Sequence, residues 1–237
     1  MATEKSYADR VGRAELLQGT ITGFGVPLIP SEPDNAIPVY EAYWQSCRTK
    51  NETIDSQAES FSVQTGQRVN HTKVMKSVVT RVQNHVLSVK ALKDYWKTTK
   101  IAGQRITTFK PTKTKPPVEG ETGTEKKKRN KGELGYADIS NNHKAFVSIL
   151  TSMGGGYTPS SPDLTIATLT ASRTTLDDFN KDIGVLAGAL SVGRIQRVNM
   201  FDKENGLSDR MISLKKNVFS QYGGNSAEYL SVKGIKV

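Results

Sequence analysis

The chain repeats itself at a fixed offset of 129 positions. The segment YAD at residues 7–9 recurs at 136–138, and QRVN at 67–70 recurs at 196–199. Over residues 7–70, 20 of 64 aligned positions are identical, against roughly 6% expected by chance at average composition. An ungapped match of this length indicates tandem duplication, and a duplicated chain is expected to fold as a pseudo-symmetric pair.

Features that both copies share are expected to serve the common fold, whereas features of one copy only are better candidates for function. Asp34 or Asn35 is predicted to cap the long helix of the first copy, and Asp163 or Thr165 that of the second, with the shared aspartates favoured. The other shared polar residues are predicted to cap helix ends or to pair with acids on a neighbouring helix; the alternative is a symmetric pair of anion-binding or subunit-contact sites. They are Arg68 with Arg197, Asn70 with Asn199, and Arg81 with Arg210.

Apolar spacing predicts helices in both copies. Val11, Ala14, Leu17 and Ile21 follow the i, i+3, i+4 pattern of one helix face. A loop rich in Gly and Pro follows in each copy, and a long helix then begins near residue 35 and near residue 166. A break is expected in copy one after Asn70 and in copy two around residues 201–208, with a further helix after each break.

These elements predict an all-α fold, a pseudo-twofold duplicated helical bundle of four long helices and two short ones with a long basic connector. Residues 1–97 form the first repeat, 98–132 a flexible linker and 133–237 the second repeat, with both repeats packing as one bundle.

The positive charge is concentrated in the connector. Residues 93–133 carry twelve Lys or Arg against five Asp or Glu, whereas the whole chain has a net charge of +10. This segment is interpreted either as a solvated linker or as a sequence-independent contact for nucleic-acid phosphates or other anions. The candidate contact residues are Lys110, Lys113, Lys115, Lys126, Lys127, Lys128, Arg129 and Lys131.

The sequence offers no catalytic constellation. The three histidines align with non-histidine residues of the other copy, and none has metal-ligand spacing. Cys47 aligns with Leu176, so it is predicted to be a buried apolar thiol. No catalytic residue, cofactor, metal or small-molecule substrate is predicted, and the protein is expected not to be an enzyme. An enzyme would require one pocket lined by Arg68, Arg81, Arg197 and Arg210.

No run approaches the ~18 apolar residues of a membrane span, and the N-terminal residues lack the apolar core of a signal peptide. Together with the single cysteine, these features predict a cytoplasmic protein that does not contact a membrane.

Several segments carry a resemblance to a known family. They are ISNNHKAF at 139–146, YTPSSPDLTI at 157–166, KNVFSQYG at 216–223, SAEY at 226–229 and VKGIK at 232–236. The chain resembles an uncharacterised bacterial family of internally duplicated, cytosolic all-helical proteins. The resemblance implies the duplicated helical fold and supplies no catalytic residue.

Two functions follow as hypotheses. The first is a non-enzymatic structural or assembly protein, a homo-oligomer that associates through helical surfaces and an apolar C-terminal tail. Its candidate subunit contacts are Tyr229, Leu230 and Ile235. The alternative is a nucleic-acid-associated protein that binds phosphates non-specifically through the lysine-rich connector.

Overall fold

The computed structural model describes residues 4–108 and 135–237, and all regular structure within these ranges is helical, as predicted. Four short 3-10 turns precede or join the α-helices. In chain order the α-helices are α1 (Glu4–Thr22), α2 (Ile37–Ser88), α3 (Trp96–Thr107), α4 (Tyr136–Ser152), α5 (Ile166–Asp202), α6 (Leu207–Tyr222) and α7 (Ala227–Lys233).

The described residues form two compact units, and each unit draws on both halves of the sequence. Unit 1 contains residues up to 58 and from 188 onward, and unit 2 contains the described residues between 59 and 187. The long helices α2 and α5 each contribute one part to each unit. The units therefore do not coincide with the predicted repeats 1–97 and 133–237. Each unit joins the first part of one half to the last part of the other.

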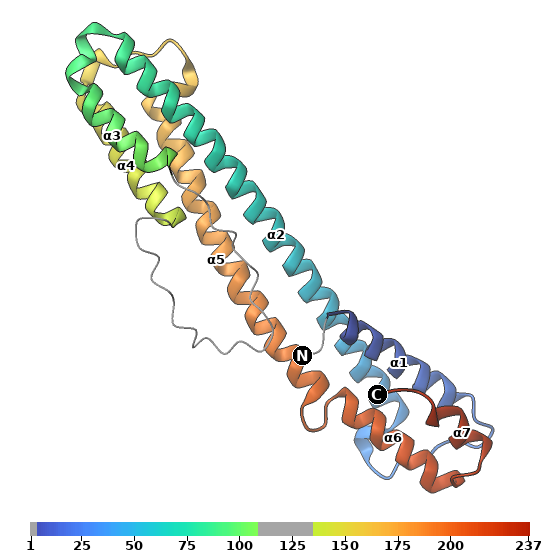
Figure 1. The fold of residues 1–237 in the computed structure, drawn as a ribbon. Coiled ribbons are helices and arrows are strands. Elements are labelled where there is room, and N and C mark those ends of the chain that lie inside the picture. The colour runs from blue at the N-terminus through green and yellow to red at the C-terminus, as the bar shows by residue number, and fades with distance from the viewer. Residues whose placement is uncertain (1–3, 109–134) are drawn as a thin grey trace. The chain divides into compact units, whose positions relative to one another are not determined.

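In unit 1, α1, α6 and α7 gather around the first part of α2 and the last part of α5 (Figure 1). The predicted stripe of α1, Val11, Ala14, Leu17 and Ile21, is buried in the core of this unit. Phe201 from α5 packs edge-on against α1 in the same core, with 4.9 Å between its ring centroid and that of Tyr7.

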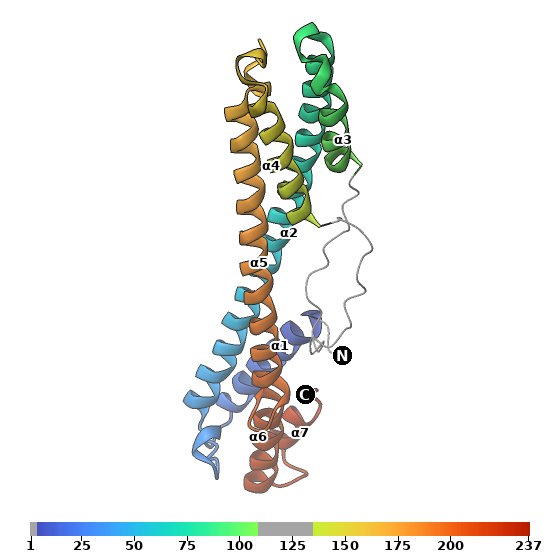
Figure 2. The same ribbon diagram turned by 90° about the vertical axis from the view of Figure 1, so that its left-hand side faces the viewer.

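In unit 2, α3 packs against α4, beside the last part of α2 and the first part of α5 (Figures 1 and 2). Val79, Val82 and Val86 of α2 are fully buried here, together with Phe146 of α4 and Leu176 of α5. The i, i+3, i+7 spacing of these valines places them on one face of α2, which explains why a valine-rich segment is helical and not a strand.

The predicted break after Asn70 is wrong, because α2 runs unbroken for 52 residues. Thr72, a candidate cap, is buried instead, and its hydroxyl donates to the Arg68 carbonyl oxygen four residues earlier at 2.8 Å. Neither Gly nor Pro occurs from His71 to Ser88 to end the helix. Within the described ranges, the predicted four long helices are therefore replaced by two, α2 with 52 residues and α5 with 37, and by five shorter ones.

The predicted break in the second copy is confirmed, since α5 ends at Asp202 and α6 begins at Leu207. Asn205 has a φ of 61°, in the left-handed region that favours Gly and Asn. At Gly206, an added Cβ would lie 2.7 Å from the carbonyl oxygen of Lys203. The turn therefore needs a residue without a side chain at this position.

The connector was predicted to begin at residue 98, but α3 continues the helical structure to Thr107. This helix buries Thr99, Gly103 and Ile106 at i, i+4 and i+7, so two of its three inward residues are small or polar. At Gly103 an added Cβ would lie 2.3 Å from the Gln83 side chain. The same Cβ would lie 3.0 Å from Val79 Cγ1, so α3 lies close to α2 at this glycine. An apolar-periodicity pattern does not reveal such a helix.

Candidate functional site

The arginines repeated between the two halves make structural contacts. In unit 1, Arg197 is buried and its guanidinium carbon lies 4.5 Å from the centre of the Tyr7 ring. In unit 2, Arg68 is buried with its guanidinium carbon 3.8 Å from the centre of the Tyr136 ring. Tyr7 lies in the first turn of α1, and Tyr136 is the first residue of α4. In both units a buried guanidinium stacks on the ring of a tyrosine from the other half.

Arg68 makes a further polar contact, because its Nη1 donates to Asn180 Oδ1 at 3.2 Å. Burial lowers the pKa of Arg68, while the neighbouring Tyr136 opposes that change. This environment is consistent with a buried cation that is held by stacking and hydrogen bonds within its unit.

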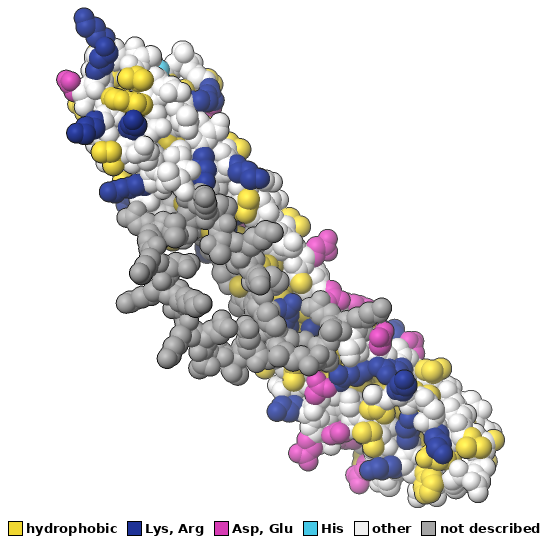
Figure 3. Space-filling view, in the orientation of Figure 1, with side chains coloured by type: hydrophobic (Ala, Val, Ile, Leu, Met, Phe, Trp, Pro, Cys, Tyr) yellow, Lys and Arg dark blue, Asp and Glu magenta, His cyan; other side chains and the backbone are white. Residues whose placement is uncertain are grey.

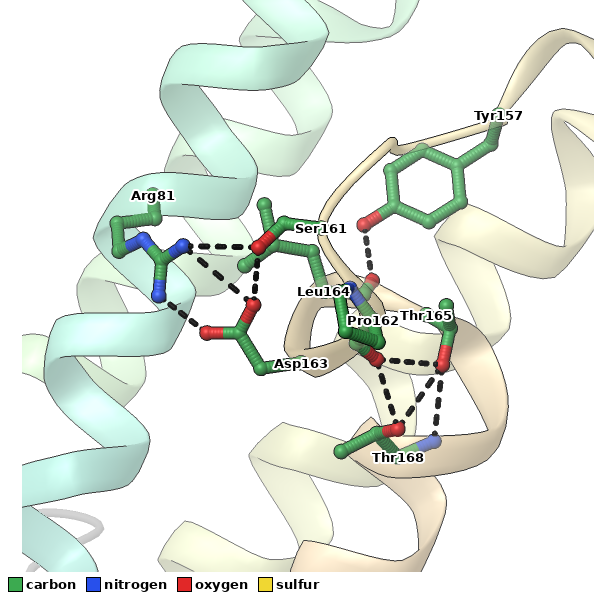
Figure 4. A network of polar contacts seen from close by, with 8 residues as sticks. All are labelled: Arg81, Tyr157, Ser161, Pro162, Asp163, Leu164, Thr165 and Thr168. Carbon is green, nitrogen blue, oxygen red and sulfur yellow. Dashed lines mark hydrogen bonds and ion pairs between the residues drawn. The ribbon is translucent and has the colours of Figure 1, made fainter.

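The other two repeated arginines, Arg210 and Arg81, each form an ion pair with an aspartate of the other half. In unit 1, Arg210 Nη1 donates to the Asp34 carbonyl oxygen at 2.7 Å, and its Nη2 lies 3.5 Å from Asp34 Oδ2. In unit 2, Arg81 forms an ion pair with Asp163 (Figure 4). The predicted pairing with acids is thus confirmed for both arginines.

The two aspartates are not the N-caps that the sequence predicted. Asp34 and Asp163 lie inside the 3-10 turns that precede α2 and α5. Thr165, the other predicted cap of the second copy, is confirmed: its Oγ1 accepts from the Thr168 backbone N–H at 3.3 Å (Figure 4). A hydrogen bond from the Ser161 hydroxyl, assisted by Arg81, lowers the pKa of Asp163.

A third pair of contacts follows the same arrangement. The Tyr43 hydroxyl donates to the Met200 carbonyl oxygen at 3.0 Å in unit 1. In unit 2, the residues 129 positions away are Ser172 and His71, and His71 Nε2 lies 2.7 Å from the Ser172 carbonyl oxygen. All three pairs join residues of opposite halves, so the four arginines predicted as one possible catalytic pocket are each engaged inside their own unit.

The predicted subunit contacts of the C-terminal tail lie on unit 1. Tyr229 packs edge-on against Phe219 with 5.0 Å between ring centroids, and Ile235 packs against the core of the unit. Val232 is fully buried, while Leu230 is 57% exposed. The Lys215 ammonium donates to the carbonyl oxygens of Lys233 and Ile235 at the end of α7. The tail is therefore docked within the chain, and of the three predicted contacts only Leu230 is exposed.

An open groove runs beside this docked tail, with a volume of about 450 Å³. Ile212, Phe219, Tyr229 and Val237 give it an apolar lining, and two lysines of α6 flank it. Figure 3 shows hydrophobic side chains interspersed with Lys and Arg over the end of unit 1 that contains α6 and α7.

A larger groove, of about 520 Å³, lies between α4 and α5 in unit 2. Lys144 and Arg173 line it together with hydroxyl side chains of both helices. Sequence reasoning missed this groove. The signal was present, since the residue 129 positions before Lys144 is Glu15, so the charge is reversed between the two halves.

The candidate anion-contact residues of the connector, Lys110, Lys113, Lys115, Lys126, Lys127, Lys128, Arg129 and Lys131, lie outside the described residues. Their role stays a prediction. Within residues 4–108 and 135–237, no group of three or more His, Cys, Asp or Glu side chains could hold a metal ion.

Burial shifts the pKa values of the Cys47 thiol and the His143 imidazole. Cys47 is fully buried and burial raises the pKa of its thiol to about 12, which confirms the prediction of a buried apolar cysteine. His143 is also fully buried, and burial, aided by the charges of Arg173 and His71, lowers its pKa to about 4. Neither ring nitrogen of His143 has a hydrogen-bond partner among the described residues.

Comparisons with known proteins supply no family. No family model, no curated protein and no solved structure matches the chain. The resemblance to the uncharacterised bacterial family therefore stays a prediction. In the part of the chain that the structure describes, no helix is both long and apolar enough to cross a membrane.

Proposed function

We propose that this protein is a cytoplasmic, non-enzymatic structural protein that associates with further copies of itself through the outward face of α6. One observation carries the proposal: an exposed stripe of apolar and oppositely charged residues on that helix. Contiguous exposed apolar surface bordered by polar residues is typical of an interaction site.

The stripe consists of Asp209, Ile212, Lys216 and Phe219, which are spaced i, i+3, i+7 and i+10 along α6. This spacing places all four on one face of the helix. All are exposed; Ile212 is 40% and Phe219 51% accessible. The same two apolar residues line the groove beside α7, so the stripe and the groove form one continuous surface.

The charges on the stripe favour a second copy of this chain as the partner. The acid stands near the start of α6 and the lysine lies seven residues later. When two copies of α6 pack antiparallel about a twofold axis, Asp209 of each copy faces Lys216 of the other, and the Ile212 side chains lie near the axis. Such a self-complementary patch is the requirement for an isologous dimer.

We further propose that the chain arose by tandem duplication, as in the family it resembles. The ungapped sequence repeat supports this, as do the matching contacts of both units: Arg197 on Tyr7 with Arg68 on Tyr136, and Arg210 to Asp34 with Arg81 to Asp163. Each half contacts the other as two subunits of an intertwined homodimer would.

Substitution of Ile212 tests the interface in the full-length chain. Ile212→Lys places a charge at the twofold axis and is expected to lower the mass measured by light scattering coupled to size exclusion, at unchanged helical content. Leu16→Lys is the matched control, since Leu16 is 57% exposed on α1 of the same unit and lies outside the groove. Equal masses for wild type and both variants would refute the interface.

A charge exchange tests the antiparallel geometry. Lys216→Glu alone is expected to weaken the dimer because it brings like charges together. Adding Asp209→Lys restores opposite charges in both pairs and is expected to recover the dimer. Failure of the double variant to recover, with its helices intact by circular dichroism, would exclude this pairing. Deleting the tail is a poorer test, because Val232 is fully buried and its loss opens the core.

The nucleic-acid alternative rests on the charge of the connector. It predicts retention on heparin or DNA that weakens steeply with salt and is lost when Lys126, Lys127, Lys128, Arg129 and Lys131 are neutralised. Binding that persists in the neutralised variant would refute this alternative.

A further inference from the structure

The groove between α4 and α5 in unit 2 brings several hydrogen-bonding side chains together. Lys144, Ser148 and Thr151 follow one another at i, i+4 and i+7 on α4, so they lie on one face of that helix. Thr170 and Arg173 enter the groove from α5. A volume of about 520 Å³ lies within the range of sites for small organic ligands.

The groove presents unused hydrogen-bond donors and positive charge. In the described part of the chain, neither the Lys144 ammonium nor the Ser148 hydroxyl has a hydrogen-bond or ion-pair partner, and both side chains are exposed. Arg173 forms an ion pair with Asp177 at 3.4 Å through one Nη. A guanidinium has five N–H donors, so this pair leaves Arg173 able to donate to a ligand as well. No acidic side chain is among the lining residues of this groove.

The corresponding region of unit 1 is chemically different. Glu15 and Glu41 stand 129 positions before Lys144 and Thr170. Both acids are already engaged across α1 and α2: Arg48 pairs with Glu15 at 2.5 Å, and Gln18 Nε2 donates to Glu41 Oε2 at 3.2 Å. Unit 1 therefore has two acids engaged in its own contacts at the place where unit 2 has Lys144 and a groove without acidic lining residues.

The hydroxyl groups of Thr151 and Thr170 also bear on which ligand the groove can bind. Thr151 and Thr170 donate to carbonyl oxygens four residues earlier on their own helices, at 3.0 and 2.8 Å. Their oxygens are thus left as acceptors for ligand hydroxyls, beside the half-buried Val147. The donors suit an anion with several oxygens, because Arg and Lys are the usual partners of phosphate groups.

We propose that this groove binds a small organic phosphate, with Lys144, Arg173 and Ser148 contacting the phosphate group and Val147 contacting the apolar part. The site belongs to unit 2 alone and does not depend on self-association through α6. It is also separate from the connector lysines, and a residue-specific measurement distinguishes binding in the groove from binding to the connector.

The experiment titrates phenyl phosphate and inorganic phosphate into the full-length chain at constant ionic strength and follows backbone amide shifts by NMR. We expect saturable shifts in residues 144–152 and 170–173, with phenyl phosphate binding more tightly than inorganic phosphate. Lys144→Ala is expected to weaken binding about tenfold, because one charge-assisted hydrogen bond is lost. Lys181→Ala is the matched control on α5, since Lys181 is exposed and lies outside the groove.

Three results would overturn the proposal. The first is an absence of saturable shifts in these residues, including the case in which only other lysine-bearing segments respond. The second is an equal loss of affinity in the Lys144→Ala and Lys181→Ala variants. The third is equally tight binding of benzoate, which would show a general anion surface and not a phosphate site.

Discussion

Protonation of His143 gives a prediction whose size follows from the structure. The imidazole is fully buried on α4, and burial, together with the charges of Arg173 and His71, lowers its pKa to about 4. In the unfolded chain a histidine has its ordinary pKa near 6.5. Between these two pH values the unfolded state binds a proton that the folded state does not, so stability falls as the pH falls from about 6.5 to about 4.

The magnitude follows from the separation of the two pKa values. Each pKa unit corresponds to about 1.4 kcal/mol, so His143 alone is expected to reduce the free energy of unfolding by about 3 kcal/mol over this range. Two variants distinguish the effect of protonating His143 from the effect of burying a polar group at this position. His143→Gln keeps a buried polar group that does not titrate, and His143→Leu removes both properties.

Urea unfolding followed by circular dichroism at pH 4, 5, 6 and 7 measures the effect. Relative to wild type, both variants are expected to gain about 3 kcal/mol between pH 7 and pH 4. Only the leucine variant should also be more stable at pH 7, because it removes two ring nitrogens that lack partners among the described residues. Parallel pH profiles for wild type and both variants would refute the reasoning.

Three further predictions concern stability and reactivity. Arg197→Lys and Arg68→Lys should each lower the free energy of unfolding by about 1–2 kcal/mol, because an ammonium does not stack as a guanidinium does; unchanged urea midpoints would contradict this. Gly206→Ala should lower the melting temperature, because its Cβ would meet the Lys203 carbonyl oxygen at 2.7 Å; a melting temperature equal to that of wild type would show that the turn adapts. The Cys47 thiol, fully buried with a pKa near 12, should resist alkylation at pH 8 until urea unfolds the chain, and rapid modification of the native protein would contradict its burial.

Local patterns predicted the features that local forces determine. The α1 stripe from Val11 to Ile21 and the burial of Cys47 follow from apolar spacing and from alignment of the two halves. The turn before α6 follows from Asn205 and Gly206, which favour that backbone conformation.

Other features depend on tertiary contacts that apolar spacing does not encode. The buried face of α3 uses Thr99 and Gly103, so its helix has a weak apolar pattern. The continuity of α2 through Thr72 results from the absence of a helix terminator, which is a weaker signal than the presence of one. Which half supplies the partner of Arg81 is a question of packing, and repeat alignment alone does not answer it.

The sequence contains part of the information needed to locate the two grooves. The exchange of Glu15 for Lys144 between the halves is a charge reversal that marks the α4–α5 groove. The heptad spacing of Ile212 and Phe219 is likewise visible in the sequence, but their exposure is known only once Met211, Leu214 and Val218 are placed in the core. An amphipathic pattern identifies a helix face and does not say which face the fold covers.

The mass of the untagged full-length protein in solution tests self-association most directly. Light scattering coupled to size exclusion, at low and high salt and with absorbance recorded at 260 and 280 nm, gives both mass and nucleic-acid content. The proposed α6 interface predicts a particle of at least twice the 26.0 kDa chain mass that persists at high salt and carries no nucleic acid. A 26.0 kDa monomer at every salt concentration would contradict it, and a monomer that carries nucleic acid only at low salt would assign the function to the connector.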